Sequence, residues 1–171
     1  MKTLAIYFSR RGENYVSGKI RNLDKGNTEY IVEFLQKNFD TDVFHVETVK
    51  EYARNYMDCT REAQRELDND ERPELKNYLK DISAYDQVII AGPCWWGTYP
   101  MAVFSAIEGL DFSDKKVFPI MTHEGSGMGH SERDLKNMLN AKEFAKGFAI
   151  HGTVCPDSED AIINWGRKNL G

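Results

Sequence analysis

Five short apolar runs, each followed by a segment with helical periodicity, constrain the fold of this chain most. The runs span residues 4–8, 42–46, 87–91, 117–121 and 148–151. Each is too short for a helix and is rich in branched and aromatic residues, which is typical of buried strands. Strands and helices that alternate in this way predict an α/β fold, in which helices cover a parallel sheet on both faces.

The segments between these runs predict the helices. From Asn27 onward, apolar residues recur at spacings of three and four, with Asn27 or Thr28 as N-cap. Between residues 47 and 83 we expect two helices that cover the sheet, one capped by Asp58 or Thr60 and one opened by Pro73. The second would turn Leu75, Tyr78, Leu79 and Ile82 inward. Later helices are predicted to start at Pro100, at Ser131, and after Asp157 or Ser158.

Length and composition narrow the class of protein. The 171 residues predict one domain over 1–171, with a core that needs neither disulfides nor metals. The chain has 22 Lys and Arg against 27 Asp and Glu, a net charge of -5, which argues against a nucleic-acid binder. Three cysteines without CxxC spacing indicate a reduced, cytoplasmic protein and no zinc site. A signal segment and a bilayer-length apolar run are both missing, so we expect no membrane association.

Three unusual loops follow the first, third and fourth predicted strands. Because the carboxyl ends of parallel strands share one edge of a sheet, the loops can meet there. The first offers a phosphate a hydroxyl, a guanidinium, amides and a helix start, through Ser9, Arg11, Asn14, Asn27 and Thr28. Residues 15–26 form an insertion that splits it. Neither GxxxxGK[ST] nor GxGxxG is present, so a single phosphate monoester fits better than a pyrophosphate. An ordinary polar turn is the alternative.

The second loop contains Pro93, Cys94, Trp95, Trp96 and Gly97. Neighbouring side chains alternate in direction, so two consecutive tryptophans cannot both face the core, and at least one is expected to be displayed. A displayed indole beside a phosphate site is a stacking platform for a flat heterocycle. A partly buried hydrophobic loop is the alternative, and a small buried side chain is the simplest role for Cys94.

The third loop combines flexible backbone with small polar side chains. Thr122, His123, Gly125, Ser126 and Gly127 suit hydrogen bonds to the polar edge of a ring. An ordinary linker with a solvent-facing His123 is the alternative.

Together the three loops resemble those of the flavodoxin family. The resemblance rests on Tyr7-Phe8-Ser9-Arg10-Arg11-Gly12, on Gly92-Pro93-Cys94-Trp95-Trp96-Gly97-Thr98 and on Thr122-His123-Glu124-Gly125-Ser126-Gly127. It implies a doubly wound, three-layer fold with a five-stranded parallel sheet of order 2-1-3-4-5, and FMN as cofactor. The first loop would hold the phosphate, and the other two would lie along the isoalloxazine. The split phosphate loop departs from the family pattern. The third loop departs from it too, because electron-carrier flavodoxins commonly have a tyrosine there and the nearest candidates in this chain are His123 and Glu124.

Two functions follow from the resemblance. An electron carrier would exchange electrons with a redox partner protein, whereas a quinone or flavin reductase would take hydride from NAD(P)H. A module that only binds flavin is a third possibility, and the protein would be a monomer or homodimer. Cys59 and Arg65 have C-x5-R spacing, but their helical, glycine-free setting argues against a thiolate phosphatase. A receiver-type signalling domain shares this architecture, but it needs an acidic cluster after the first strand and an acceptor Asp after the third. This chain has Ser9 and Pro93 at those places.

Overall fold

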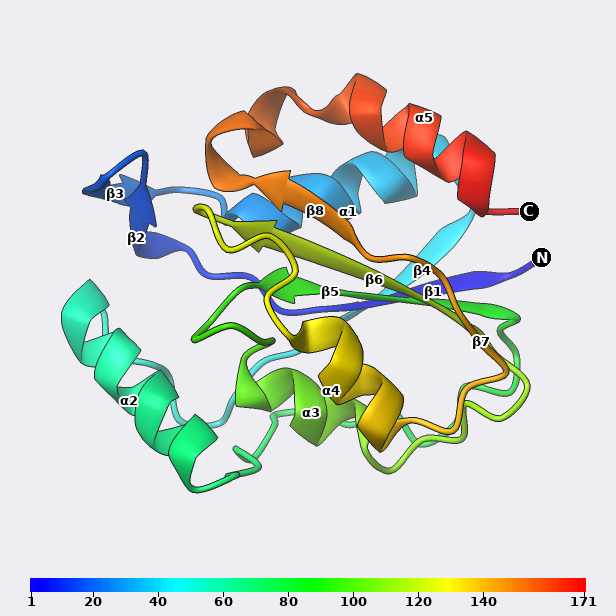
Figure 1. The fold of residues 1–171 in the computed structure, drawn as a ribbon, viewed down its shortest axis with the longest axis horizontal. Coiled ribbons are helices and arrows are strands. Elements are labelled where there is room, and N and C mark those ends of the chain that lie inside the picture. Colours follow the sequence, from blue (N-terminus) through cyan, green and yellow to red (C-terminus); the bar gives the residue numbers. More distant parts are fainter.

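A parallel β-sheet forms the middle layer of the computed structural model, which describes residues 1–171 (Figure 1). Its order is β4-β1-β5-β6-β7, and β8 also pairs with β6. The strands are β1 (Thr3–Tyr7), β4 (Thr41–His45), β5 (Gln87–Pro93), β6 (Lys116–His123), β7 (Glu143–Phe144) and β8 (Phe148–His151). Since β7 and β8 both run parallel to β6, they are two pieces of one fifth strand. The predicted order 2-1-3-4-5 is therefore confirmed.

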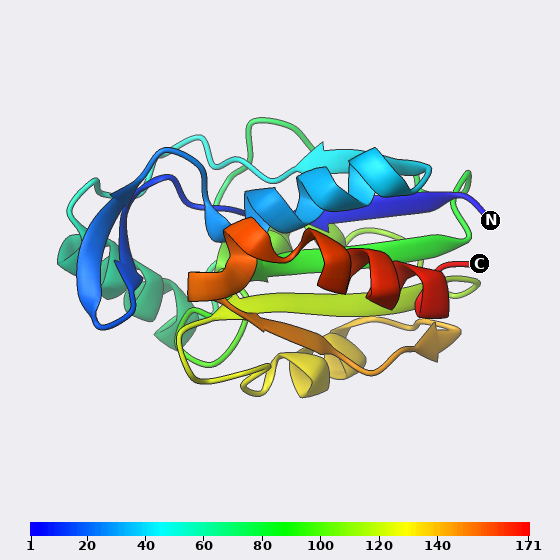
Figure 2. The same cartoon turned by 90° about the horizontal axis from the view of Figure 1, so that it is seen from above.

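Helices cover both faces of this sheet. On one face lie α1 (Asn27–Asn38) and α5 (Glu159–Asn169), and on the other lie α3 (Met101–Ile107) and α4 (Ser131–Met138) (Figures 1 and 2). The central strands are buried on both sides, and Ile6, Ile89 and Ile90 have no exposed surface. That double burial explains why these strands are continuous apolar runs. No helix is long and apolar enough to cross a membrane.

A β-hairpin occupies most of the insertion between β1 and α1. It consists of β2 (Gly12–Val16) and β3 (Lys19–Leu23), which pair antiparallel around a turn at Ser17 and Gly18. Both turn residues have positive φ, which suits the two-residue turns that match strand twist. The hairpin extends beyond the sheet at the carboxyl ends of the strands (Figure 2). The predicted loop over residues 15–26 is therefore mostly regular structure, and it begins earlier, at Gly12.

The polar helix predicted near residue 60 is present as α2 (Tyr56–Asp68), but it begins earlier and lies elsewhere than expected. Its N-cap is Asn55, whose Oδ1 accepts a hydrogen bond from the Asp58 amide at 3.0 Å, so the predicted caps Asp58 and Thr60 are wrong. The helix also does not cover the sheet. It lies beyond α3, near the hairpin (Figure 1).

The helix predicted from Pro73 is absent. Residues 73–83 run without helical structure, and Leu75 instead forms an antiparallel bridge with Thr48. The amides of Val49 and Lys76 donate to the carbonyls of Glu74 and Glu47, both at 2.9 Å. These hydrogen bonds between two distant segments of the chain satisfy the backbone groups in place of helical bonds. Of the predicted inward residues, Leu75 and Ile82 are buried, Leu79 is half-buried and Tyr78 is exposed.

The first and last helices begin close to their predicted starts. Gly26 is the flanking residue of α1, so the predicted caps Asn27 and Thr28 are already helical. The capping side chain comes from the end of β1, because the Ser9 hydroxyl accepts from the Glu29 amide at 3.1 Å. A 3₁₀ turn, η1 (Gly152–Asp157), precedes α5, and Ser158 flanks that helix as predicted.

Candidate functional site

The loops after β1, β5 and β6 meet at the carboxyl end of the sheet, as the strand order requires. The hydroxyls of Thr28 and Thr122 lie 3.0 Å apart, which joins the start of α1 to the third loop. The Cys94 amide donates to the Thr122 carbonyl at 2.8 Å, and the rings of Phe8 and Trp95 contact edge to face at 5.1 Å. Residues from all three predicted loops therefore lie close together at the carboxyl end of the sheet.

The start of α1 supplies free donors to this place. The Asn27 and Thr28 amides donate to no group of the protein, while the Glu29 amide is occupied by Ser9. Free amides at a helix start, with the positive end of the helix dipole, favour an anion. The Ser9 hydroxyl accepts one bond, so its own proton remains available to a ligand. Thr28 is buried, and its hydroxyl is engaged with that of Thr122.

Arg11 and Asn14 are engaged elsewhere. Arg11 forms a two-pronged ion pair with Glu29, in which Nε donates to Oε2 at 3.0 Å and Nη2 pairs with Oε1. The Arg11 hydrogen bond is the main reason that the pKa of Glu29 is lowered. Asn14 donates to the carbonyls of Arg10 and Gly12 at 2.9 and 3.2 Å, which braces the first loop. Of the five predicted phosphate ligands, the structure therefore gathers Ser9, Asn27 and Thr28.

A Glu29→Gln variant is expected to lower the urea midpoint at pH 7, because it loses the Arg11 ion pair. The folded pKa of Glu29 lies below its ordinary value of 4.5, so the stabilisation is complete above pH 4.5 and is lost as the pH falls through the folded pKa. The deficit against wild type should thus shrink below pH 4.5 and then vanish. Urea unfolding across pH tests this, with exposed Glu74→Gln as control. A deficit that persists at the lowest pH contradicts the ion-pair explanation.

The second loop is a tight turn that sends its two indoles in different directions. Trp95 and Thr98 exchange backbone hydrogen bonds at 2.8 and 3.3 Å around Trp96 and Gly97, whose φ values are +55° and +84°. Trp95 packs edge-on against Phe8 and Tyr52, and its ring centroid lies 5.1 Å from each of theirs. Trp96 is 48% exposed, and its Nε1 donates to the Thr60 carbonyl of α2 at 2.9 Å. The prediction that one indole is displayed is confirmed.

Pro93 and Cys94 directly precede that turn. Pro93 ends β5 opposite Thr122. Cys94 is half-buried, and burial raises the pKa of its thiol, although the Gly97 backbone and the Ser126 side chain oppose that effect. A raised pKa keeps the thiol protonated, which agrees with a packing role. No group of three His, Cys, Asp or Glu side chains lies close enough to hold a metal ion.

The third loop leaves open space beside its glycines. Gly125 and Gly127 have positive φ, and no other group lies within 4 Å of where a Cβ would stand. The Gly125 amide donates to His123 Nδ1 at 2.9 Å. Burial lowers the pKa of His123, and His151, whose ring lies 5.5 Å away, lowers it further. His123 is therefore a neutral acceptor within the loop.

Glu124 lies between the third loop and the hairpin. Its Oε2 accepts from the Ser17 amide at 3.2 Å, and its Oε1 is buried without a hydrogen-bond partner. The Ser17 hydroxyl lies 2.7 Å from that of Thr153, just after β8. On its other side the hairpin meets α2, where Tyr15 stacks on Tyr56 with ring centroids 6.2 Å apart. The hairpin thus links α2 to the third loop across the carboxyl end of the sheet.

A side-chain network surrounds Thr98, and the sequence analysis does not predict it. The Thr98 hydroxyl and His130 Nδ1 both lie 2.7 Å from Asp134 Oδ2, and the His130 amide donates to the Gly97 carbonyl at 2.7 Å. Gly129 packs directly against that carbonyl. The only sequence signal was the four-residue spacing of His130 and Asp134 at the predicted start of a helix.

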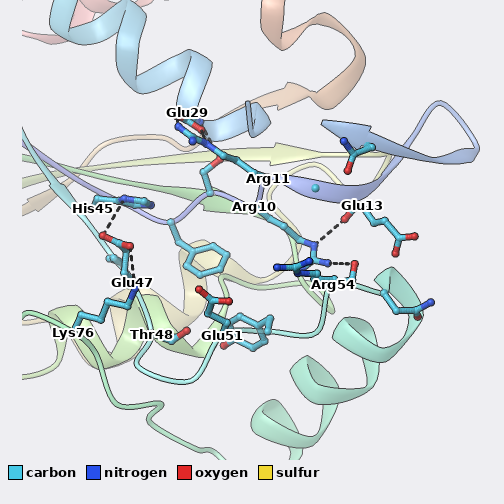
Figure 3. Close-up of a pocket in the computed structure, with 17 residues that line it drawn as sticks. Arg10, Arg11, Glu13, Glu29, His45, Glu47, Thr48, Glu51, Arg54 and Lys76 are labelled. Atoms are coloured by element: carbon cyan, nitrogen blue, oxygen red, sulfur yellow. Dashed lines mark hydrogen bonds and ion pairs between the residues drawn. The ribbon is translucent and has the colours of Figure 1, made fainter. Parts of the chain in front are cut away.

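A polar cavity of about 930 Å³ adjoins the first loop on the β4 side (Figure 3). Ser9 and Arg11 line it, but none of the predicted residues of the second and third loops do. Its apolar lining includes Phe8 and Tyr52, the two rings that Trp95 contacts. Arg10 donates to the carbonyls of Glu13, Ala53 and Arg54 at 2.8 to 3.0 Å. The cavity therefore adjoins the loop cluster through the first loop, and Trp95 contacts two of the rings that line it.

The fold and the loops define the class: a doubly wound α/β protein with a candidate ligand site at the switch point of its sheet. The family model described as Flavodoxin matches residues 22–169, and the chain belongs to the flavodoxin family. That match includes Asn27, Thr28 and both later loops, and it starts after Ser9, Arg11 and Asn14. None of the curated proteins matches the chain.

Solved structures agree over nearly the whole chain. A candidate flavoprotein from Bacteroides uniformis ATCC 8492 is 24% identical, covers 97% of each chain and has a TM-score of 0.74. One from Bacteroides eggerthii DSM 20697 is 25% identical, covers 98% of this chain and 96% of its own, and has the same TM-score. A flavoprotein from Lactobacillus acidophilus NCFM, solved in complex with FMN, is 17% identical, covers 93% and 98%, and has a TM-score of 0.59.

Proposed function

We propose that this chain is an FMN-binding flavoprotein that acts in electron transfer. One observation carries the proposal: the free amides of Asn27 and Thr28 lie in the same loop cluster as the displayed indole of Trp96 and the open glycines of the third loop. A phosphate needs the first of these and a flat ring needs the others. The FMN complex of the Lactobacillus acidophilus relative supports the choice of ligand.

The residues of the site fit FMN unequally. Ser9, Asn27 and the Thr28 amide would hold the phosphate, and Trp96 and residues 122–127 would border the ring. Arg11 would contribute by neutralising Glu29, which otherwise places a carboxylate in the first turn of α1. When bound, FMN supplies the redox chemistry, because it accepts one or two electrons. The protein binds and orients it and shields it from water.

A reductase that takes hydride from NAD(P)H is the second candidate. Such an enzyme needs space for a second substrate, and the cavity beside the first loop offers it next to the loop cluster (Figure 3). Cationic side chains from Arg10 and Arg54 lie in that cavity, and neither contacts a carboxylate. A carrier would instead receive electrons from a redox partner protein.

Titration of FMN with the purified protein tests the proposal. We expect the fluorescence of FMN to be quenched on binding, and riboflavin, which lacks the phosphate, to bind at least 100-fold more weakly. If FMN keeps its full fluorescence in the presence of excess protein, the proposal is wrong. Equal affinity for riboflavin would contradict the phosphate site at α1. Anaerobic mixing of the FMN complex with NADPH or NADH then separates the candidates, because rapid bleaching indicates a reductase and its absence a carrier.

A further inference from the structure

Four exposed apolar side chains form a stripe that runs from the hairpin across α2 to the second loop. Tyr15 on β2 and Ile20 on β3 are directly paired, and Tyr15 stacks on the first residue of α2. Met57 is the next residue of that helix, and Trp96 donates to the Thr60 carbonyl about one turn further along it. We call Ile20, Tyr15, Met57 and Trp96 the apolar stripe.

The stripe is too exposed to belong to the core. Its side chains are 43 to 49% exposed, and they are four of the eight large apolar side chains of the chain that are exposed. Single exposed apolar residues are ordinary, but a group of them marks an interaction surface. The hairpin is inserted between Ser9 and Asn27, and the amide of its turn residue Ser17 donates to Glu124. A protein that covers the stripe therefore lies beside all three loops of the candidate site.

Two free cations lie on the outer strand of the hairpin. Lys19 and Arg21 flank Ile20 on β3, and both are exposed. Neither forms an ion pair, whereas the next cation along the chain, Lys25, pairs with Glu33. Strand alternation places both on the opposite face of the hairpin from Ile20. Because β3 pairs only with β2, its outer edge is open, and a partner at that edge can reach side chains of both faces.

The charge on β3 selects the kind of partner. Free cations beside exposed apolar groups suit a contact surface that is acidic, and they steer such a partner toward the hairpin. A second copy of this chain fits less well. If two β3 edges met about a twofold axis, the same cations would face one another, and charges on an edge strand oppose pairing between copies.

We propose that the apolar stripe and the outer edge of β3 are the docking surface for an electron-transfer protein whose contact face is acidic. The inference rests on the proposed FMN function and extends it by naming the chemistry of the redox partner. No bond forms or breaks in the transfer itself. One electron leaves the reduced metal centre of the partner, which is oxidised, and enters the flavin, which is reduced.

Two probe carriers of opposite charge test the role of the cations. Reduced plant-type [2Fe–2S] ferredoxin, an acidic carrier, donates one electron to the FMN complex, and oxidised cytochrome c, a basic carrier, accepts one from the reduced complex. Stopped-flow mixing gives both second-order rate constants. Lys19→Glu combined with Arg21→Glu should lower the ferredoxin rate at least tenfold at low salt and should raise the cytochrome c rate. General damage to the protein would lower both rates.

Matched variants separate the docking surface from net charge. Lys142→Glu combined with Lys168→Glu makes the same change in net charge on exposed residues beside β7 and at the end of α5, away from the hairpin (Figure 1). It should change either rate less than twofold. Ile20→Ser combined with Met57→Ser should lower the ferredoxin rate at least threefold even at high salt, where charges are screened. Val49→Ser, an exposed apolar change elsewhere, is its control.

Carbodiimide cross-linking gives a readout that does not depend on FMN. The reagent joins a lysine amine to a carboxylate in contact with it. With ferredoxin and the ligand-free protein it should link Lys19 and leave Lys142 unlinked, as peptide mass spectrometry would show. Lys19→Arg keeps the charge but removes the amine, so it should abolish the link and keep the electron-transfer rate of wild type.

Each other outcome overturns the inference. Equal effects of the hairpin and control charge changes show that only net charge matters. An unchanged ferredoxin rate in the Ile20→Ser, Met57→Ser variant shows that the stripe is not contacted. A wild-type dimer in sedimentation analysis that this variant dissociates shows that a second copy covers the stripe. If wild type does not bind FMN, the proposed function fails, and the presence or absence of the Lys19 cross-link then decides the docking surface separately.

Discussion

Gly129→Ala is expected to destabilise the protein by about 3 kcal/mol and to weaken FMN binding at least tenfold. The added Cβ would lie 2.2 Å from the Gly97 oxygen and 2.7 Å from its carbonyl carbon, so backbone must move. Overpacking of this kind costs about 1–3 kcal/mol, and a non-glycine residue at φ +53° adds about 1–2 kcal/mol. The movement would also break the hydrogen bond from His130 to Gly97, which shapes the second loop.

Gly127→Ala is the matched control for the stability part of this prediction. Gly127 lies in the same loop with a nearly equal φ of +59°, but no other group stands within 4 Å of its Cβ position. The Gly127→Ala variant should lose only the stability that corresponds to placing a non-glycine residue at positive φ, about 1–2 kcal/mol. Urea unfolding of both variants measures the difference, and FMN titration measures the loss of affinity. Equal losses of stability would show that the contact between Gly129 and Gly97 does not shape the loop.

The sheet could be predicted because its strands are buried on both faces. Such strands must be apolar throughout, so residues 4–8 and 87–91 stand out from the polar segments around them. The fifth strand is split between β7 and β8, and only β8, the more apolar piece, was predicted. The hairpin has a sequence signal of its own, namely Ser17-Gly18 between Tyr15-Val16 and Lys19-Ile20.

The segment after β4 could not be predicted, because distant contacts determine it. Leu75 and Ile82 are spaced as in a helix and are buried, but pairing of residues 74–76 with 47–49 makes that segment extended. Spacing identifies which residues are buried and leaves the conformation open when the backbone finds partners far along the chain. The position of α2 has a similar origin, since it depends on contacts with the hairpin.

Strand order alone predicts that the three loops of the site meet. It does not predict which side chains of those loops contact one another. Carboxyl ends of parallel strands share an edge, so Ser9, Trp95 and Thr122 had to come together. Whether Arg11 meets a ligand or Glu29 depends on a side chain 18 residues away. Asp134 likewise reaches Thr98 from 36 residues away. Such pairs are set by tertiary packing, and no local pattern marks them.

The two tryptophans are expected to respond to alanine in opposite ways. Trp95→Ala should destabilise the protein by about 2–4 kcal/mol, because it removes the ring between Phe8 and Tyr52 from the edge of the core. Trp96→Ala should change stability by about 1 kcal/mol or less, since its indole is half exposed and makes one hydrogen bond, to Thr60.

The loss of FMN affinity, compared in folded protein, should be larger for Trp96→Ala than for Trp95→Ala, which is the reverse of the order for stability. An indole stacked on a flat ring contributes about 0.5–1.5 kcal/mol beyond area burial, so Trp96→Ala should weaken FMN binding roughly tenfold. Trp96→Phe should recover part of that loss, because it restores an aromatic face. FMN titration and urea unfolding of the three variants give both quantities. If Trp95→Ala loses FMN while keeping wild-type stability, and Trp96→Ala loses neither, then Trp95 is the stacking residue and the side of the turn that faces the flavin is the one toward Phe8.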